Sequence, residues 1–199
     1  MSDLQIPVRR RATVTPGLLI GWLVVAIWLA ESLDYLLPVD MDYWGIEARS
    51  LNGLTGVPLA PFLHADFGHV IANTVPLVVL GLLVAWRAGA ALTRVLAIVV
   101  LLGGLGVWLL APSDIITIGA SGLVFGLLGY LLAAGVVTRR WVDVLLSVIV
   151  LVLFGGMLTG VTPFGVGYGV SWLAHMAGFG AGVVAALLFA PRRATAPRT

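Results

Sequence analysis

The sequence predicts an all-α fold, a polytopic membrane helix bundle with six transmembrane helices. Three observations support this prediction: 60% of the 199 residues are hydrophobic, only 10% are charged, and the mean hydropathy is +1.09. A soluble domain is normally about a quarter charged, so the surplus apolar surface must face a lipid bilayer. Six helices of roughly 20 residues with their loops use nearly the whole chain, which leaves no room for a separate soluble catalytic domain.

Six apolar segments account for most of the chain. Each is long enough to cross the roughly 30 Å hydrocarbon core, although the fourth is short and follows a Gly-rich turn. The first segment follows a basic stretch, but it is too long for a signal-peptide core and no small-x-small cleavage site follows it. We predict cytoplasmic tails at 1–16 and 191–199 and a membrane domain at 17–190. The predicted spans are 17–37, 69–86, 90–110, 121–137, 141–158 and 171–190.

The arginines predict the orientation. Short loops that carry Lys or Arg stay on the cytoplasmic side of a membrane, and ten of the 11 basic residues fall on one side of the six spans. Arg49 is the exception. We therefore expect a multi-pass protein of the cell (plasma) membrane with both termini in the cytoplasm. The ten residues are Arg9, Arg10, Arg11, Arg87, Arg94, Arg139, Arg140, Arg192, Arg193 and Arg198.

Composition also excludes several classes of function. The chain has no Cys, which rules out disulfides, thiolate nucleophiles, iron–sulfur sites and Cys-type zinc sites. All of its basic residues are Arg, so a Walker-type phosphate loop and Schiff-base chemistry are excluded. The net charge of +2 is small and dispersed, so nucleic acid is not an expected partner. We expect neither a metal ion nor another cofactor, and the sequence leaves the oligomeric state undecided.

Two outer loops stand out by composition. The loop at 38–63 mixes acids with aromatic and aliphatic residues. This composition suits a segment lying in the membrane interface, and it suits a partly ordered extracellular loop equally well. The loop at 159–170 contains four glycines, which predicts a mobile cap.

Polar residues at membrane depth are the candidates for function. His64, His69 and His175 lie at the outer ends of the second and sixth spans, Asn73 lies one helical turn after His69, and Ser121 opens the fourth span. Singly, each has an ordinary explanation: a serine bonding back to its own helix, an interfacial histidine, an asparagine joining two helices. Those explanations do not predict that all five meet at one level.

Small residues predict that the fourth and sixth spans meet. Glycines at spacings of three and four let two membrane helices approach closely, and that approach would bring Ser121 within hydrogen-bond reach of His175. The glycines also have a competing interpretation as generic packing residues. They are Gly122, Gly126 and Gly129 on the fourth span, and Gly178 and Gly182 on the sixth.

The chemistry of these side chains fits acyl transfer. A serine hydroxyl becomes nucleophilic when a neutral imidazole takes its proton, so Ser121 and His175 form a candidate dyad. His69, Asn73 and the first amides of the fourth span would stabilise an oxyanion. We expect no acid inside a span at this level, so packing should position His175, with Phe125 stacked on its ring.

Three motifs follow one another along the chain and cover about residues 60–185. They are His64-x4-His69-x3-Asn73, then Gly119-Ala120-Ser121-Gly122 with Gly126, then Ala174-His175-x2-Gly178-x3-Gly182. These motifs resemble those of the rhomboid family of intramembrane serine proteases, in its minimal six-span bacterial form. The resemblance implies a nucleophile at Ser121, a base at His175 and oxyanion stabilisation by His69 and Asn73. His64, Gly119, Gly122, Phe125 and Gly178 would have supporting roles.

The resemblance also implies the substrates, which are single-span or polytopic membrane proteins. They would enter sideways from lipid past the fifth span and the cap loop, and would be cut near the outer surface. Two departures from the family pattern are visible. Thr55 and Gly56 stand where many relatives have a Trp-Arg pair, which leaves the anchoring of the first outer loop open. Phe125 stands where some bacterial relatives have Tyr.

Other functions are open to test. The alternative within the same family is a catalytically silent binder of transmembrane helices, but such relatives typically lack the nucleophile or the base. A haem or metal protein would need the histidines as ligands, yet His64 and His69 are five residues apart, which on a helix points them in different directions. A small transporter would show internal repeats, and none is evident.

Overall fold

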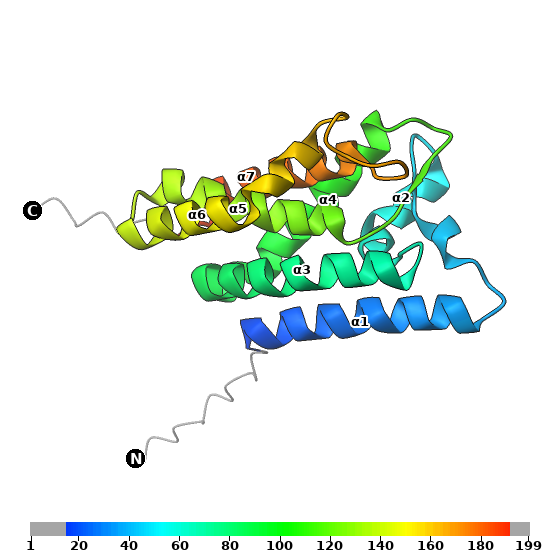
Figure 1. Ribbon diagram of the computed structural model, residues 1–199, viewed down its shortest axis with the longest axis horizontal. Helices are drawn as coiled ribbons and strands as arrows, with labels where there is room; N and C mark the ends of the chain where they lie inside the picture. Colours follow the sequence, from blue (N-terminus) through cyan, green and yellow to red (C-terminus); the bar gives the residue numbers. More distant parts are fainter. Residues whose placement is uncertain (1–14, 192–199) are drawn as a thin grey trace, which may run out of the picture.

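A computed structural model describes residues 15–191 of the chain. Within them, six long helices form one bundle (Figure 1), as the sequence predicts. Residues 1–14 and 192–199 lie outside the described part, and so do six of the arginines used above. The predicted tails therefore remain predictions. The six arginines are Arg9, Arg10, Arg11, Arg192, Arg193 and Arg198.

The long helices follow the predicted spans closely. Helix α5 begins at Ser121, and α4 ends at Leu110, as predicted for the fourth and third spans. The fifth span differs, because its α-helix stops early and the 3-10 segment η4 (Gly155–Val161) completes it. The bounds are α1 Pro16–Leu36, α3 Phe67–Ala88, α4 Leu92–Leu110, α5 Ser121–Thr138, α6 Trp141–Phe154 and α7 Trp172–Phe189.

Local signals explain where these helices begin and end. Pro16 opens α1, where its missing N–H removes no hydrogen bond. The Asp66 carboxylate caps α3 by accepting the His69 N–H at 2.8 Å. Gly89, at φ +53°, ends α3, and the short 3-10 turn η3 (Gly89–Ala91) leads into α4. The single apolar stretch Phe67–Leu110 is therefore two helices.

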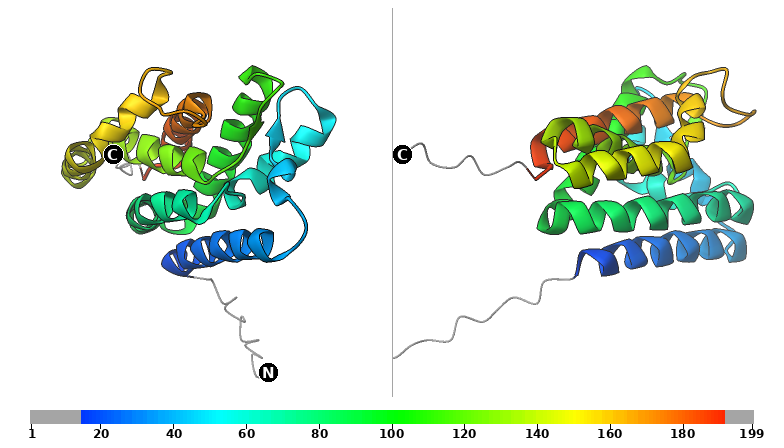
Figure 2. Two further views of the ribbon diagram at one scale, coloured as in Figure 1. Left: turned by 45° about the vertical axis from the view of Figure 1, so that its right-hand side comes forward. Right: turned by 60° about the vertical axis from the view of Figure 1, so that its left-hand side comes forward.

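Helix α5 is the centre of the bundle. Its side chains are buried on all sides, and Leu127, Leu128 and Tyr130 are fully inaccessible. Helix α7 packs along it, with α4 beside both and α6 on another side, while α1 lies against α3 in every view (Figure 2). A helix that is apolar all round must be covered by neighbours, and α5 is the helix that carries Ser121.

Glycines bring α5 and α7 into backbone contact, as the sequence predicts. A Cβ added at Gly178 would overlap the Gly122 carbonyl, and one at Gly182 would overlap the Gly126 carbonyl. Any side chain at these positions would force the two helices apart. The close approach places the outer end of α7 directly beside the outer end of α5.

The first outer loop has regular secondary structure over much of its length. It contains the 3-10 turn η1 (Met41–Trp44), the strand β1 (Ile46–Glu47), the helix α2 (Leu51–Leu59) and the turn η2 (Ala60–Phe62). Strand β1 pairs antiparallel with β2 (Ile116–Thr117), with Ile46 opposite Thr117. Its position in the membrane interface stays a prediction.

Arg49 and Trp108 anchor this loop, which answers how it is held without the Trp-Arg pair. The Arg49 guanidinium donates to the carbonyls of Leu109, at 3.2 Å, and Ala111, at 2.8 Å. In return, the Trp108 indole N–H donates to the Ser50 carbonyl at 2.8 Å. The one arginine that departs from the orientation pattern therefore ties the loop to the outer end of α4.

The inner end of α6 is held by a buried polar cluster. Arg87 Nε donates to the Asp143 carboxylate at 2.6 Å, and the Thr138 hydroxyl donates to its other oxygen at 2.8 Å. One turn later, the Ser147 hydroxyl donates to the Leu131 carbonyl of α5 at 2.7 Å. These bonds connect α6 to α3 and α5 near the predicted cytoplasmic side.

Candidate active site

Ser121 and His175 form a hydrogen-bonded pair. Ser121 is the first residue of α5 and His175 lies in the first turn of α7, so the glycine contact between these helices brings the two side chains together. Ser121 Oγ lies 3.0 Å from His175 Nε2. This is the geometry in which an imidazole accepts a hydroxyl proton.

Two further contacts fix the orientation of the His175 ring: one at Nδ1 and one on a face of the ring. Nδ1 lies 3.0 Å from the Gly160 carbonyl, so Nδ1–H donates to that oxygen and Nε2 is left as the acceptor for Ser121. The Phe125 ring stacks on the imidazole, with centroids 4.0 Å apart and planes 10° apart. The expected stacking is present, and a backbone carbonyl adds the alignment that a carboxylate provides in other dyads and triads.

Gly160 is a site residue that sequence reasoning missed. It lies in η4, and a Cβ there would be 3.1 Å from Phe125 Cζ and 3.3 Å from His175 Nδ1. Both are tighter than ordinary van der Waals contact, so a side chain would crowd the imidazole. The only signal in the sequence is the glycine itself, which stands among several in the cap loop.

The turn before Ser121 depends on Gly119. Its φ of +111° is rarely adopted by other residues, and its N–H donates to the Ala60 carbonyl of η2 at 2.9 Å. A Cβ here would lie 2.7 Å from His69 Cε1, so the His69 ring sits directly against this turn. The first outer loop and α3 both support the segment that carries Ser121.

His64 supports the same segment from behind. The Ala120 N–H donates to His64 Nε2 at 3.2 Å, and the His64 ring meets His69 edge-on with centroids 4.8 Å apart. His64 is 1% exposed. Burial, reinforced by His69, lowers the pKa of His64 to about 4 against the opposing effects of the Phe62 carbonyl and Asp66. The ring is therefore neutral at physiological pH and can accept the Ala120 N–H.

Asn73 is buried one turn below His69 on α3. Its side-chain N–H donates to the His69 carbonyl at 3.0 Å, a bond within its own helix. Asn73 therefore touches the site through His69 in this arrangement. The amide group has a second N–H, which could serve an oxyanion.

The start of α5 supplies further donors. The first hydrogen bond from the α5 region back to this turn is that of Val124 N–H to the Ala120 carbonyl, at 3.0 Å. The amides of residues 121–123 precede it, and they point out of the helix N-terminus with its positive dipole end. This end of α5 can stabilise negative charge beside Ser121 Oγ.

One expectation about acids is wrong. Glu31 lies inside α1, is 5% exposed, and borders a small pocket together with His64. A buried carboxyl therefore does lie within a span near the level of the site. Its burial is not evident from the sequence, because Glu31 stands only a few residues before the end of its predicted span.

Metal ligation is a separate question. Within residues 15–191, no group of three or more His, Cys, Asp or Glu side chains is arranged to hold a metal ion. The expectation that the protein needs no metal or other cofactor stays a prediction.

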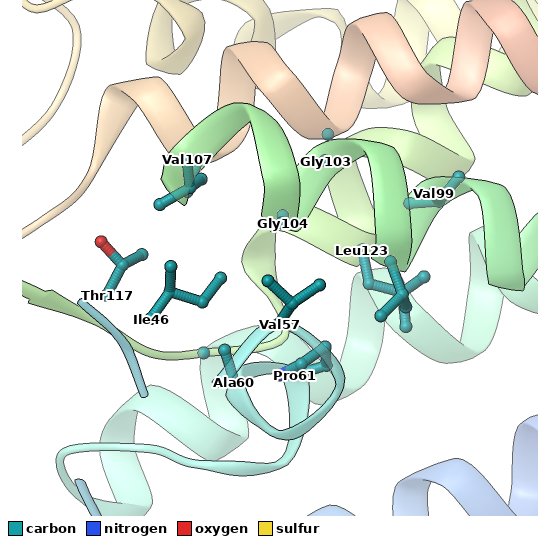
Figure 3. Close-up of a pocket in the computed structure, with 15 residues that line it drawn as sticks. Ile46, Val57, Ala60, Pro61, Val99, Gly103, Gly104, Val107, Thr117 and Leu123 are labelled. Carbon is teal, nitrogen blue, oxygen red and sulfur yellow. The ribbon is translucent and has the colours of Figure 1, made fainter. Parts of the chain in front are cut away.

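A small apolar cavity of about 40 Å³ borders the Ser121 segment (Figure 3). The first outer loop forms one wall, with Ile46 and Val57, and α4 forms another, with Gly104 and Val107. Gly119 and Gly122, on either side of Ser121, also line it. The remaining lining residues are Ala60, Pro61, Val99, Val100, Gly103, Thr117, Leu123, Ala174 and Gly178.

The chain matches a known family and several known proteins. A family model described as the Rhomboid domain matches residues 52–192. The chain is 42% identical over 194 residues to the uncharacterized protein Rv1337 of Mycobacterium tuberculosis (strain ATCC 25618 / H37Rv), covering 93% of this chain and 80% of that protein. It is 40% identical over 196 residues to the uncharacterized protein ML1171 of Mycobacterium leprae (strain TN), covering 94% of this chain and 77% of that protein. The family match includes every segment that forms the site.

Proposed function

Because this chain belongs to the rhomboid family and is a multi-pass membrane protein, we propose that it is an intramembrane serine endopeptidase that cleaves transmembrane segments with a Ser121–His175 dyad. One observation carries the proposal: Ser121 Oγ lies 3.0 Å from His175 Nε2 while Nδ1 is engaged by the Gly160 carbonyl. The Gly160 contact selects the tautomer that leaves Nε2 free to accept the Ser121 proton. An incidental serine–histidine contact would have no need of that second contact.

The proposed reaction begins at the Ser121 hydroxyl. Its oxygen attacks the scissile carbonyl as its proton moves to His175 Nε2, and the imidazolium keeps its Nδ1–H on the Gly160 carbonyl. The tetrahedral intermediate then collapses, and Nε2–H protonates the leaving amine. Water, activated by the same imidazole, hydrolyses the acyl-enzyme and frees Ser121.

Negative charge that develops on the substrate oxygen needs donors. The amides at the start of α5 are positioned for this, and the His69 ring lies against the Gly119 turn beside them. Asn73 would join them with its second side-chain N–H, while the first stays on the His69 carbonyl. Donors of this kind act mainly on the transition state.

The proposed substrates are membrane spans with an outer end that unwinds easily. A peptide carbonyl in a regular helix is already hydrogen-bonded, so attack requires a locally extended segment. The apolar, glycine-lined cavity next to Ser121 supports a preference for small residues at the cut. The proposed setting is the plasma membrane, with the site open to the outer side and substrate entering past α6 and the loop at 162–171.

The test is a cleavage assay with the purified full chain in liposomes and a panel of single-span reporters. Cleavage is expected with the wild type in excess EDTA, and it should vanish in both Ser121→Ala and His175→Ala. Persistent cleavage in either variant would contradict the dyad. Binding of reporters without any cleavage by the wild type would favour the catalytically silent alternative.

A further inference from the structure

Glu31 is a buried carboxylic side chain that the proposed reaction does not use. It lies in the outer half of α1, is 5% exposed, and its Oε2 has no hydrogen-bond partner. Ionisable groups at such positions in membrane helices are expensive to bury, and they face functional interiors far more often than lipid. Glu31 therefore needs a partner inside the protein.

The residues around Glu31 include other polar side chains. The outer part of α1, η1 and the segment before α3 border a small, tightly filled pocket here. Asp34, on the same pocket, already accepts the Met41 N–H. The pocket is lined by Ala30, Glu31, Asp34, Met41, Asp42, Leu63 and His64.

His64 has a buried donor that borders this pocket. Its Nε2 accepts the Ala120 N–H at 3.2 Å, so a neutral ring must carry its proton on Nδ1. Nδ1 is buried and makes no hydrogen bond of good geometry, although the Phe62 carbonyl lies close enough to act on the ring. Two residues that are nine-tenths or more buried, each with a polar atom lacking a hydrogen bond of good geometry, thus line one pocket.

We propose that Glu31 is a positioning residue for the Ser121 segment, with its side-chain oxygen accepting Nδ1–H of His64 across this pocket. The bond holds His64 in the tautomer and orientation that keep Ala120 N–H on Nε2. Ala120 is the residue before Ser121, so α1 would help to set the nucleophile through two hydrogen bonds. This inference rests on the proposed function for its kinetic consequences only.

Glu31 is a better acceptor here than its neighbour Asp42. Asp42 also has a buried oxygen without a partner, but the rest of its side chain is partly exposed and can be solvated. Glu31 cannot turn to water in the same way. The Phe62 carbonyl is the competing acceptor for Nδ1–H, because it lies on the same segment. The experiment separates these three acceptors.

The first measurement does not depend on activity. Hydrogen exchange of the full chain in detergent is followed in peptides that cover residues 119–122. Loss of one hydrogen bond in Glu31→Ala should speed exchange of the Ala120 amide about fivefold. Glu31→Gln keeps an acceptor oxygen and should restore most of the protection. The control Glu47→Gln alters an exposed carboxylate on β1 and should change nothing.

The second measurement is a double-mutant cycle on reporter cleavage. Glu31→Ala should lower kcat about tenfold with KM unchanged, because it misplaces the nucleophile and leaves the substrate-binding surface intact. If Glu31 acts through His64, the double variant Glu31→Ala/His64→Ala should be no worse than His64→Ala alone.

Several outcomes would overturn the inference. If hydrogen exchange at residues 119–122 is unchanged in Glu31→Ala, the acceptor of Nδ1–H is the Phe62 carbonyl. If exchange there rises in Asp42→Asn and not in Glu31→Ala, the acceptor is Asp42. Additive kinetic effects, or faster exchange spread evenly over α1 and α3, would make Glu31 a purely structural residue. A wild type that cleaves no reporter would refute the proposed protease, while the exchange result would still decide the role of Glu31.

Discussion

Helices α7 and α6 both pack on α5, but they are attached in different ways. Gly178 and Gly182 bring α7 into contact with the α5 backbone along its length. Helix α6 is bound at its inner end by Asp143 and Ser147, whereas its outer half exposes most of Val152 and Leu153. The two candidate dyad residues thus lie on the tightly packed pair α5 and α7, and α6, past which we propose that the substrate enters, carries neither.

The largest effect should come from adding a methyl group to the tightly packed pair. In Gly182→Ala the new Cβ would overlap the Gly126 carbonyl, a backbone atom that cannot rotate away, so we expect little folded protein and no activity. Size-exclusion chromatography and thermal melting measure this. Gly180→Ala is the matched control, because nothing lies within 4 Å of its Cβ. Normal melting of Gly182→Ala would contradict the rigid contact.

Breaking the inner anchor of α6 should be the next largest effect. Arg87→Ala leaves the Asp143 carboxylate, whose side chain is 1% exposed, without its ion pair, and should cost about 3 kcal/mol of stability. Hydrogen exchange should rise first in α6 and leave the α5–α7 contact protected. A uniform rise over all helices would mean that α6 is not a separable unit.

Asn73 tests whether the site extends beyond α5 and α7. If it stabilises the oxyanion, Asn73→Ala should lower kcat by about 10² to 10³ with KM little changed and a nearly normal melting point. Its present bond lies within α3, so its loss should not separate helices. A lowered melting point with normal kcat in the folded fraction would remove Asn73 from the site.

Gly160 connects the two regions, and its substitution should give a purely kinetic effect. In Gly160→Ala the new methyl group crowds both Phe125 and the His175 ring, so kcat should fall by about 10² through misplacement of the base. Gly156→Ala lies in the same 3-10 segment with no neighbour within 4 Å and should behave as the wild type. Equal activity of the two variants would mean that the alignment of His175 does not depend on the 3-10 segment η4.

The smallest effect concerns Asp42 of η1, which lies beside the outer end of α1. Burial, and next Asp34 and Asp40, raise the pKa of Asp42 to about 6 from its ordinary 3.8. The folded state therefore holds this proton more tightly than the unfolded chain, and the stability from this group is lost as pH rises through 6. Asp42→Asn should raise the melting point at pH 7–8 and leave it nearly unchanged at pH 4.

His64 gives the opposite pH dependence and serves as an internal check. Its pKa is lowered to about 4, so its contribution to stability is complete above pH 6.5 and is lost as the pH falls towards 4. Wild-type melting should therefore decline in acid, and Asp42→Asn should not remove that decline. If it did, the two groups would titrate as one unit.

The sequence predicted the six helices and the meeting of Ser121 with His175 because both follow from simple patterns. Apolar length defines a span, polar residues at depth are rare, and glycines at helical spacing mark a close contact. Phe125 was found because residues one turn apart share a helix face. These signals are local or periodic, so they can be read directly from the sequence.

What the sequence did not predict depends on the backbone or on pairs distant in the chain. The Gly160 carbonyl has no side-chain signature. The pairing of β1 with β2 spans two residues on each strand, too short for an alternating pattern. Arg49 looked like an exception to the orientation rule because its carbonyl partners at the end of α4 are set by tertiary structure. Glu31 looked like a loop-flanking acid for the same reason.

The Gly160 carbonyl, which orients the candidate base His175, belongs to a segment continuous with α6. Gly160 follows α6 through the 3-10 turn, so any outward displacement of the outer end of α6 withdraws the acceptor from His175 Nδ1. The imidazole would then be free to rotate or change tautomer, and Ser121 would lose its proton acceptor. In the proposed enzyme, an open state would thereby be disarmed towards water and lipid esters, and closure behind a substrate would restore its reactivity.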